Sequence, residues 1–112
     1  MKDYVEATKT ITAGMKELSK DIPGVLQGFG AMSGAAKEDN ALDKKTKEFI
    51  ALALGVAGHC DGCIGFHMKE LVELGATKPE VCEALGAAIF MGGGPSLMYA
   101  AEAMEAYEQF SK

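Results

Sequence analysis

Apolar and polar side chains follow a helical period along almost the whole chain. Apolar residues recur three and four positions apart, and no stretch alternates residue by residue as a half-buried strand does. The pattern therefore predicts an all-α fold of about five to six helices. The expected helices cover roughly 2–20, Pro23 to near Gly34, Asp43 to Ala57, Cys60 to Leu74, roughly 78–91, and Ser96 to Phe110.

Residues with strong capping preferences mark several of these boundaries. Asp43 can accept a hydrogen bond from a free amide at the start of the third helix. Gly58 marks the end of that helix, and Gly75, a residue type that readily adopts the left-handed conformation, ends the fourth. Thr77 and Glu80 have the spacing of a capping box, so the fifth helix is expected to begin after Thr77.

The third expected helix has more apolar surface than one small chain is expected to bury. Residues 49–57 are apolar nearly all round, and such a helix is normally buried in a domain core or between subunits. Small chains also bury a smaller fraction of their surface than large ones. A chain of 112 residues with seven methionines and fourteen glycines is therefore expected to form a homo-oligomer.

Length and composition favour one globular domain that covers residues 1–112. With 48% hydrophobic and 24% charged residues, the chain resembles folded proteins rather than disordered ones. Its formal net charge is −5, whereas binding to a polyanion requires clustered Lys and Arg. We therefore expect no nucleic acid partner.

The sequence also predicts no membrane association. The longest uncharged stretch, Ala84–Ala101, is interrupted by Gly92-Gly93-Gly94-Pro95, whereas a membrane span needs about 20 continuous apolar residues. The first ten residues lack the apolar segment of a secretory signal, and three cysteines are an odd number for a closed disulfide framework. A cytoplasmic, reducing setting is expected, in which the close pair Cys60 and Cys63 would be reactive or metal-bound.

Cys60, Cys63 and His67 have the most informative spacing in the sequence. Residues three and four apart share a helix face, so the three side chains form one stripe and the two sulfurs can reach each other. The helix start favours ionisation of Cys60, whereas proximity to His67 favours ionisation of Cys63. Which thiol attacks first therefore stays open. Asp61 is expected to oppose ionisation of both thiols through like-charge repulsion.

Glu48 is expected to meet His67 if two helices pack antiparallel through the short connection Gly58-His59. Glu48 lies nine residues before Ala57, about 13 Å along a helix, and His67 lies seven residues after Cys60, about 10 Å along the next. A carboxylate at that level can orient the imidazole and stabilise its protonated form. The expected unit is a carboxylate, an imidazole and a dithiol.

Such a unit suits the reduction of a hydroperoxide. A thiolate attacks the O–O bond, an acid protonates the departing alkoxide, and the sulfenic acid condenses with the second thiol to form a disulfide. An external thiol reductant then restores the dithiol by exchange. The same groups would also serve a general disulfide reductase, and neither reaction requires a bound cofactor.

The motif extends beyond the dithiol and resembles a known family. Glu48, Cys60, Cys63 and His67 are followed by Leu74-Gly75-Ala76-Thr77 with Glu80, and then by Gly92-Gly93-Gly94-Pro95. Over roughly residues 44–104 this order resembles the AhpD-like branch of the carboxymuconolactone decarboxylase family. Similar members often carry an aromatic residue just before the second cysteine, where this chain has a glycine.

The resemblance implies a helical fold that assembles into trimers or hexamers. It also implies alkyl hydroperoxidase activity, with a dithiol reductant such as a lipoyl- or thioredoxin-like protein. By the same resemblance, Cys63 is the thiol that attacks the peroxide and Cys60 is its resolving partner. Glu48 and His67 are then the proton relay.

Other interpretations fit the same residues. A zinc site would combine the two thiols and the imidazole of the stripe with a fourth ligand from Glu48, His59 or Cys82. Lactone decarboxylation, the reaction that names the family, would not require the dithiol. A purely structural oligomer with inert thiols is a further alternative.

Three of these side chains also have simpler expected roles. Cys82 stands alone among apolar neighbours and is predicted to be a small core residue. His59 is predicted to be a helix-end residue whose ring meets solvent or backbone. Without the resemblance, Glu48 would equally well be a surface residue at the edge of a helix.

Overall fold

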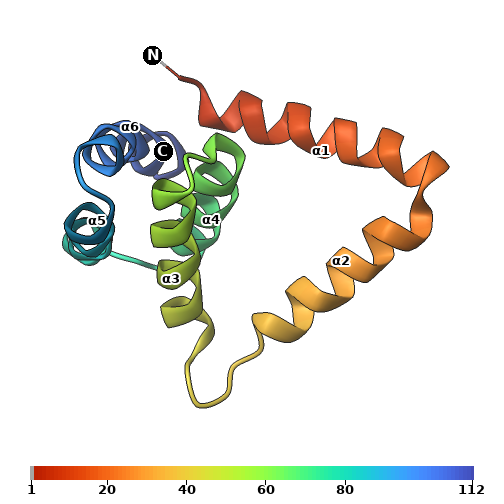
Figure 1. Cartoon of the computed structure of the whole chain (residues 1–112), viewed down its shortest axis with the longest axis horizontal. Helices are drawn as coiled ribbons and strands as arrows, with labels where there is room; N and C mark the ends of the chain where they lie inside the picture. Colours follow the sequence, from red (N-terminus) through yellow and green to blue (C-terminus); the bar gives the residue numbers. More distant parts are fainter. Residues whose placement is uncertain (1) are drawn as a thin grey trace.

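The protein consists of helices joined by short connections. The structure, a computed structural model, describes residues 2–112, and within that range it contains six helices and no strand. The predicted all-α fold is therefore confirmed (Figure 1). The helices are α1 (Tyr4–Asp21), α2 (Pro23–Ala36), α3 (Lys44–Ala57), α4 (Asp61–Glu73), α5 (Lys78–Gly92) and α6 (Gly94–Phe110).

The predicted caps form at the starts of α3 and α5. The Asp43 side chain accepts a hydrogen bond from the Thr46 N–H at 2.7 Å. At α5 the Thr77 side chain accepts from the Glu80 N–H, and the Glu80 side chain accepts from the Thr77 N–H. These bonds satisfy amide groups that have no partner within their own helix, so the local sequence determines where both helices begin.

Glycines end two helices where the backbone turns sharply. Gly75 has a φ of 80° after α4, and Gly93 has a φ of 77° after α5. Side chains disfavour this left-handed region, so glycine suits both positions. The last helix begins at Gly94, two residues earlier than expected, because Pro95 fits a first helical turn, where its missing N–H is not needed.

The core lies between α3, α4, α5 and α6, and α1 packs across α4 and α6 (Figure 1). Each of these five helices contributes buried apolar side chains to one cluster, which removes apolar surface from water. The largest of them are fully buried and include Tyr4, Leu52, Val56, Ile64, Met68, Leu71 and Val81. This packing fixes α3 against α4, the two helices that carry the predicted site residues.

The first two helices, α1 and α2, form an open V that extends away from the other four helices (Figure 1). Only the beginning of α1 is buried, at Tyr4 and Thr8, and no residue of α2 is buried. Apolar side chains on α2 are exposed instead, with Val25 at 65% and Phe29 at 63%. None of the helices within residues 2–112 is both long and apolar enough to cross a membrane.

Helix α3 is buried on one side only within this chain. Leu52, Gly55 and Val56 are buried, whereas Ile50 is 46% and Leu54 is 67% exposed. The chain therefore does not enclose the all-round apolar run of this helix. Its burial between subunits stays a prediction.

Candidate functional site

Cys60 and Cys63 lie at the start of α4 and are joined by a disulfide, with their Cα atoms 5.2 Å apart. Cys60 is the residue that caps α4, and its sulfur accepts a hydrogen bond from the Cys63 N–H at 3.2 Å. The cap position directs the first sulfur over the first helical turn, and Cys63 lies on that same turn. The predicted reach of one sulfur to the other is confirmed.

Gly55 lets α3 approach this turn closely. A Cβ atom at Gly55 would lie 3.0 Å from the Cys63 Cβ, and the Gly55 carbonyl accepts a hydrogen bond from the Cys60 N–H at 2.9 Å. A larger residue would push the two helices apart. Sequence reasoning missed this role, although a glycine inside an apolar helix is a usable signal of close packing.

His67 and Glu48 meet between α4 and α3, as predicted. The His67 Nδ1 atom lies 2.7 Å from the Glu48 Oε2 atom, and the glutamate side chain is only 1% exposed. The tight connection at Gly58 and His59 reverses the chain, so that two residues 19 positions apart lie side by side. A carboxylate beside Nδ1 favours a proton on that nitrogen, which leaves Nε2 free to accept another.

A lysine side chain also reaches the Glu48 carboxylate. The Lys37 Nζ atom, from the end of α2, lies 3.8 Å from the Glu48 Oε1 atom. Lys37 lies within residues 35–40, a small and polar segment whose composition predicts a linker, and it belongs to no motif. Sequence reasoning therefore missed it.

The disulfide, His67 and Lys37 all line one open cavity of about 710 Å³, which lies between the V of α1 and α2 on one side and α4 on the other. Its apolar lining comes from Ile11, Met15, Phe29 and Phe66. A cavity that is mostly apolar with a few polar groups at one place is typical of a small-molecule site. The arrangement brings the two cysteine sulfurs and a hydrogen-bonded imidazole to one accessible space.

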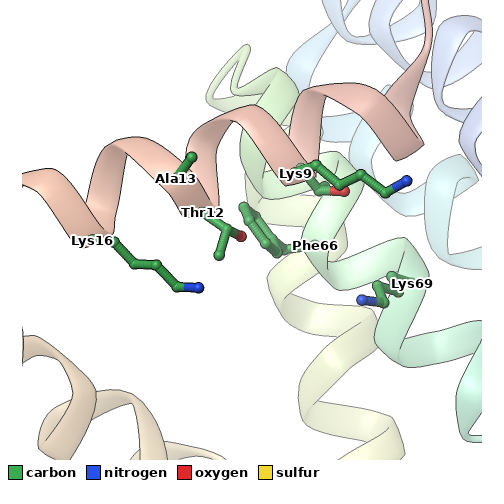
Figure 2. Close-up of a pocket in the computed structure, with 7 residues that line it drawn as sticks. Lys9, Thr12, Ala13, Lys16, Phe66 and Lys69 are labelled. Atoms are coloured by element: carbon green, nitrogen blue, oxygen red, sulfur yellow. The ribbon is translucent and has the colours of Figure 1, made fainter.

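A smaller hollow of about 330 Å³ adjoins this cavity and shares Phe66 and Lys69 with it. Lys9 and Lys16 of α1 also line it, and Figure 2 shows them with Thr12 and Phe66. Positive charge therefore borders the dithiol cavity on the α1 side, although the formal net charge of the chain is −5.

Asp61, which was expected to oppose ionisation of the thiols, forms an ion pair with a lysine. The Lys2 Nζ atom lies 2.9 Å from Asp61 Oδ1 and also contacts Glu102. Hydrogen bonds to Glu102 and then to Asp61 raise the pKa of Lys2, so it stays positively charged. The positive charge of Lys2 opposes the repulsion that was expected between Asp61 and a thiolate.

His59 is an exposed residue just after the end of α3, as predicted. Its ring also stacks on Tyr99 of α6, with ring centroids 4.6 Å apart, a contact that the sequence did not indicate. The tight reversal gives His59 a φ of 55° and turns its ring towards α6. His59 is not among the residues that line the dithiol cavity.

Cys82 was predicted to lie in the core, and that prediction is wrong. It is a free, exposed cysteine on α5. Val81 and Leu85 are four residues apart and face the core, whereas Cys82 is rotated by about 100° from Val81. Within residues 2–112 no group of three or more His, Cys, Asp or Glu side chains is placed to hold a metal ion.

Comparison with known proteins gives consistent matches over most of the chain. The sequence model of the carboxymuconolactone decarboxylase family matches residues 23–106. An uncharacterized protein of Haemophilus influenzae is 42% identical over 105 residues, which are 94% of this chain and 93% of that protein.

Two solved structures share the fold. The apo structure of a carboxymuconolactone decarboxylase family protein from Legionella pneumophila is 56% identical, with a TM-score of 0.95 over 97% of each chain. A family member from Thermotoga maritima is 29% identical, with a TM-score of 0.76 over 96% of this chain and 89% of that one. A role in an antioxidative response has been suggested for the Thermotoga protein.

Proposed function

Because the chain belongs to the carboxymuconolactone decarboxylase family, we propose that it is an AhpD-like thiol peroxidase that reduces organic hydroperoxides. One observation supports this most strongly. The disulfide-forming pair Cys60 and Cys63 lines the same cavity as His67, which is hydrogen-bonded to the buried Glu48. The suggested antioxidative role of the Thermotoga relative agrees with this reaction.

The proposed first step is attack of the Cys63 thiolate on the terminal oxygen of ROOH. A sulfur–oxygen bond forms, the O–O bond breaks, and the alkoxide takes a proton from His67 to leave as ROH. The Cys60 thiol then attacks the sulfenic acid. A disulfide forms, and the hydroxyl group leaves as water after taking a proton. The dithiol loses two electrons, and the peroxide gains them.

Glu48 and His67 are the proposed proton relay. With Nδ1 bound to the carboxylate, the imidazole can accept a thiol proton at Nε2 and later donate it to the departing alkoxide. A positively charged imidazole next to a buried carboxylate is stabilised by the opposite charge. The 2.7 Å contact between the two side chains supports this role.

Turnover needs a reductant that the chain does not contain. We propose an external dithiol of the lipoyl- or thioredoxin-like class, one thiolate of which attacks the Cys60–Cys63 disulfide. Its second thiol then resolves the mixed disulfide, so that the reductant becomes the disulfide and both cysteines return to thiols. Such a reductant places the protein in the cytoplasm, where dithiols are kept reduced.

The active form is proposed to be a homo-oligomer, a trimer or a hexamer. Apolar side chains on α3 and α5 are exposed in the single chain, with Leu54 at 67%, Phe90 at 83% and Met91 at 79%. An apolar surface of this kind is stabilised when a partner covers it. Sedimentation of the purified protein tests this, because a monomer at micromolar concentration would contradict it.

The proposed reaction is tested with reduced protein and cumene hydroperoxide. We expect peroxide consumption, a Cys60–Cys63 disulfide detected by mass spectrometry, and a Cys82 thiol that stays free. Cys63→Ser should abolish consumption, whereas Cys82→Ser should leave it unchanged. A labelled Cys82 beside an untouched pair would contradict the proposal.

The name of the family supports a second candidate reaction, lactone decarboxylation. It would not use the dithiol. A variant with both Cys60→Ser and Cys63→Ser that still decarboxylates a carboxymuconolactone would favour this reaction. Turnover of a small disulfide without turnover of peroxide would instead favour a general disulfide reductase.

A further inference from the structure

We propose that Lys37 is a positioning residue that compensates the charge of the buried Glu48 carboxylate and thereby holds His67 in the tautomer that accepts a thiol proton. Its significance for catalysis rests on the proposed function, but its effect on thiol reactivity can be measured without any peroxide. No motif in the sequence points to Lys37, so the inference rests on the contacts described below.

Glu48 is enclosed, and its two oxygens face two different side chains, an imidazole and an ammonium group. The side chain is 1% exposed. Oε2 lies 2.7 Å from His67 Nδ1, and Oε1 lies 3.8 Å from Lys37 Nζ. Burial of a carboxylate is costly unless opposite charge compensates it. Among residues 2–112, these two side chains are its ion-pair partners.

The backbone around Lys37 is fixed on both sides. Lys37 caps the end of α2, and its N–H donates to the Ser33 carbonyl at 3.1 Å. The following residues are bound to α3, since Lys47 Nζ donates to the Glu38 carbonyl at 2.6 Å and the Lys44 N–H donates to Asp39 Oδ1 at 2.6 Å. The loop therefore holds the lysine where it reaches Glu48.

Other charges near the site do not replace Lys37. On α4, Glu70 and Glu73 line the same cavity and add negative charge to it. Lys69 also lines the cavity, but within residues 2–112 only Lys37 and His67 form ion-pair contacts with Glu48. Three carboxylates of α5 and α6 have lysine partners of their own. Glu80 pairs with Lys45, Glu102 with Lys2, and Glu108 with Lys78.

Loss of Lys37 would change the hydrogen bond between Glu48 and His67. Without the cation, the buried carboxylate has no lysine at Oε1, and a buried carboxylate without a compensating charge takes up a proton more easily. A protonated Glu48 donates to Nδ1, which moves the imidazole proton to Nε2. That tautomer cannot accept a proton from Cys63, so the thiolate forms only at higher pH.

The test is the rate of iodoacetamide alkylation of the reduced dithiol as a function of pH, with the alkylated cysteines identified by mass spectrometry. In Lys37→Met and Lys37→Gln we expect the acidic limb of the plot of alkylation rate against pH to move to higher pH by about one unit. At a given pH on that limb, alkylation is then roughly tenfold slower. Lys37→Arg keeps the charge and should restore the wild-type profile.

Lys45→Met is the matched control. Lys45 also pairs with a glutamate and is 33% exposed, close to the 35% of Lys37, but it does not line the dithiol cavity. Its profile should stay at the wild-type position. An equal shift in Lys45→Met, or an unshifted Lys37→Met, would overturn the proposal.

A double-variant cycle tests whether Lys37 acts through Glu48. In a Glu48→Gln background, Lys37→Met should cause no further shift of the pH profile, because there is no carboxylate left for the lysine to pair with. An equal shift in both backgrounds would show a direct effect of the lysine on the thiols and would overturn the proposal. Failure of peroxide consumption with the expected alkylation profiles would count against the peroxidase function alone.

Discussion

The His67 imidazole and the Glu48 carboxylate share a 2.7 Å contact that joins α4 to α3 beside the dithiol. The glutamate is almost fully enclosed, while the histidine side chain keeps 23% exposure towards the cavity. One partner is therefore fixed, and the other stays accessible to exchange protons. This asymmetry is what an orienting carboxylate and a working base require.

Glu48→Gln should slow peroxide-driven disulfide formation by about 10- to 100-fold, because the amide cannot stabilise a charged imidazole. Stopped-flow mixing of reduced protein with cumene hydroperoxide measures this rate. Glu83→Gln on the exposed face of α5 is the control and should keep the wild-type rate. An unchanged rate in Glu48→Gln would remove the glutamate from the mechanism.

Gly55→Ala should destabilise the protein, because the added Cβ would lie 3.0 Å from the Cys63 Cβ and force α3 and α4 apart. We expect a loss of about 1–3 kcal/mol in the free energy of unfolding. Gly86→Ala is the matched control in α5, with no atom within 4 Å of the added Cβ. It should stabilise by about 0.5–1 kcal/mol. Denaturant unfolding distinguishes the two, and equal effects would contradict the close-packing argument.

Acid should weaken the starts of α3 and α5. Hydrogen bonds from Thr46 lower the pKa of Asp43, and the Thr77 amide, followed by Lys45, lowers the pKa of Glu80. Carboxylates with lowered pKa values stabilise the fold above their ordinary pKa, and this stabilisation is lost as the pH falls through the lowered value.

The melting temperature should therefore fall between about pH 5 and pH 3, and by less in a variant that combines Asp43→Asn with Glu80→Gln. Both replacements keep a capping side chain but do not titrate. Glu83→Gln should retain the full acid dependence. Parallel acid profiles in all three proteins would exclude the two caps as its source.

Ionisation of Tyr4 should lower the stability of the fold at alkaline pH. Its hydroxyl is buried without a hydrogen-bond partner among the described residues, and burial raises its pKa from 10.0 to about 12. The unfolded chain ionises first, so stability is complete below about pH 10 and declines as the pH rises towards 12.

Tyr4→Phe should reduce this alkaline decline in melting temperature and should be neutral or stabilising by about 1 kcal/mol at pH 7, since it removes an unpaired polar group. Tyr107→Phe is the control for the loss of one tyrosine. If the decline is as steep in Tyr4→Phe as in the wild type, another group causes it.

Much of the site follows from the sequence because it depends on local periodicity. Three- and four-residue spacing places Cys60, Cys63 and His67 on one helix face in any helix. The short reversal at Gly58 then makes α3 and α4 antiparallel, so the rise per residue alone brings Glu48 level with His67. The structure contains this contact, while the catalytic role of the four residues stays a prediction.

Other features depend on how segments far apart in the sequence approach each other, and the periodicity of apolar residues does not indicate those contacts. Lys37 reaches Glu48 because the loop after α2 is hydrogen-bonded to α3, which places the end of α2 beside that helix. Cys82 is exposed because the core takes the helix face of Val81, one position away. The helices, their caps and the stripe of two cysteines and an imidazole follow from residue order, since each is set within a few residues. The charges around that stripe and the apolar surfaces that stay uncovered depend on the folded arrangement, because they arise from contacts between side chains far apart in the chain.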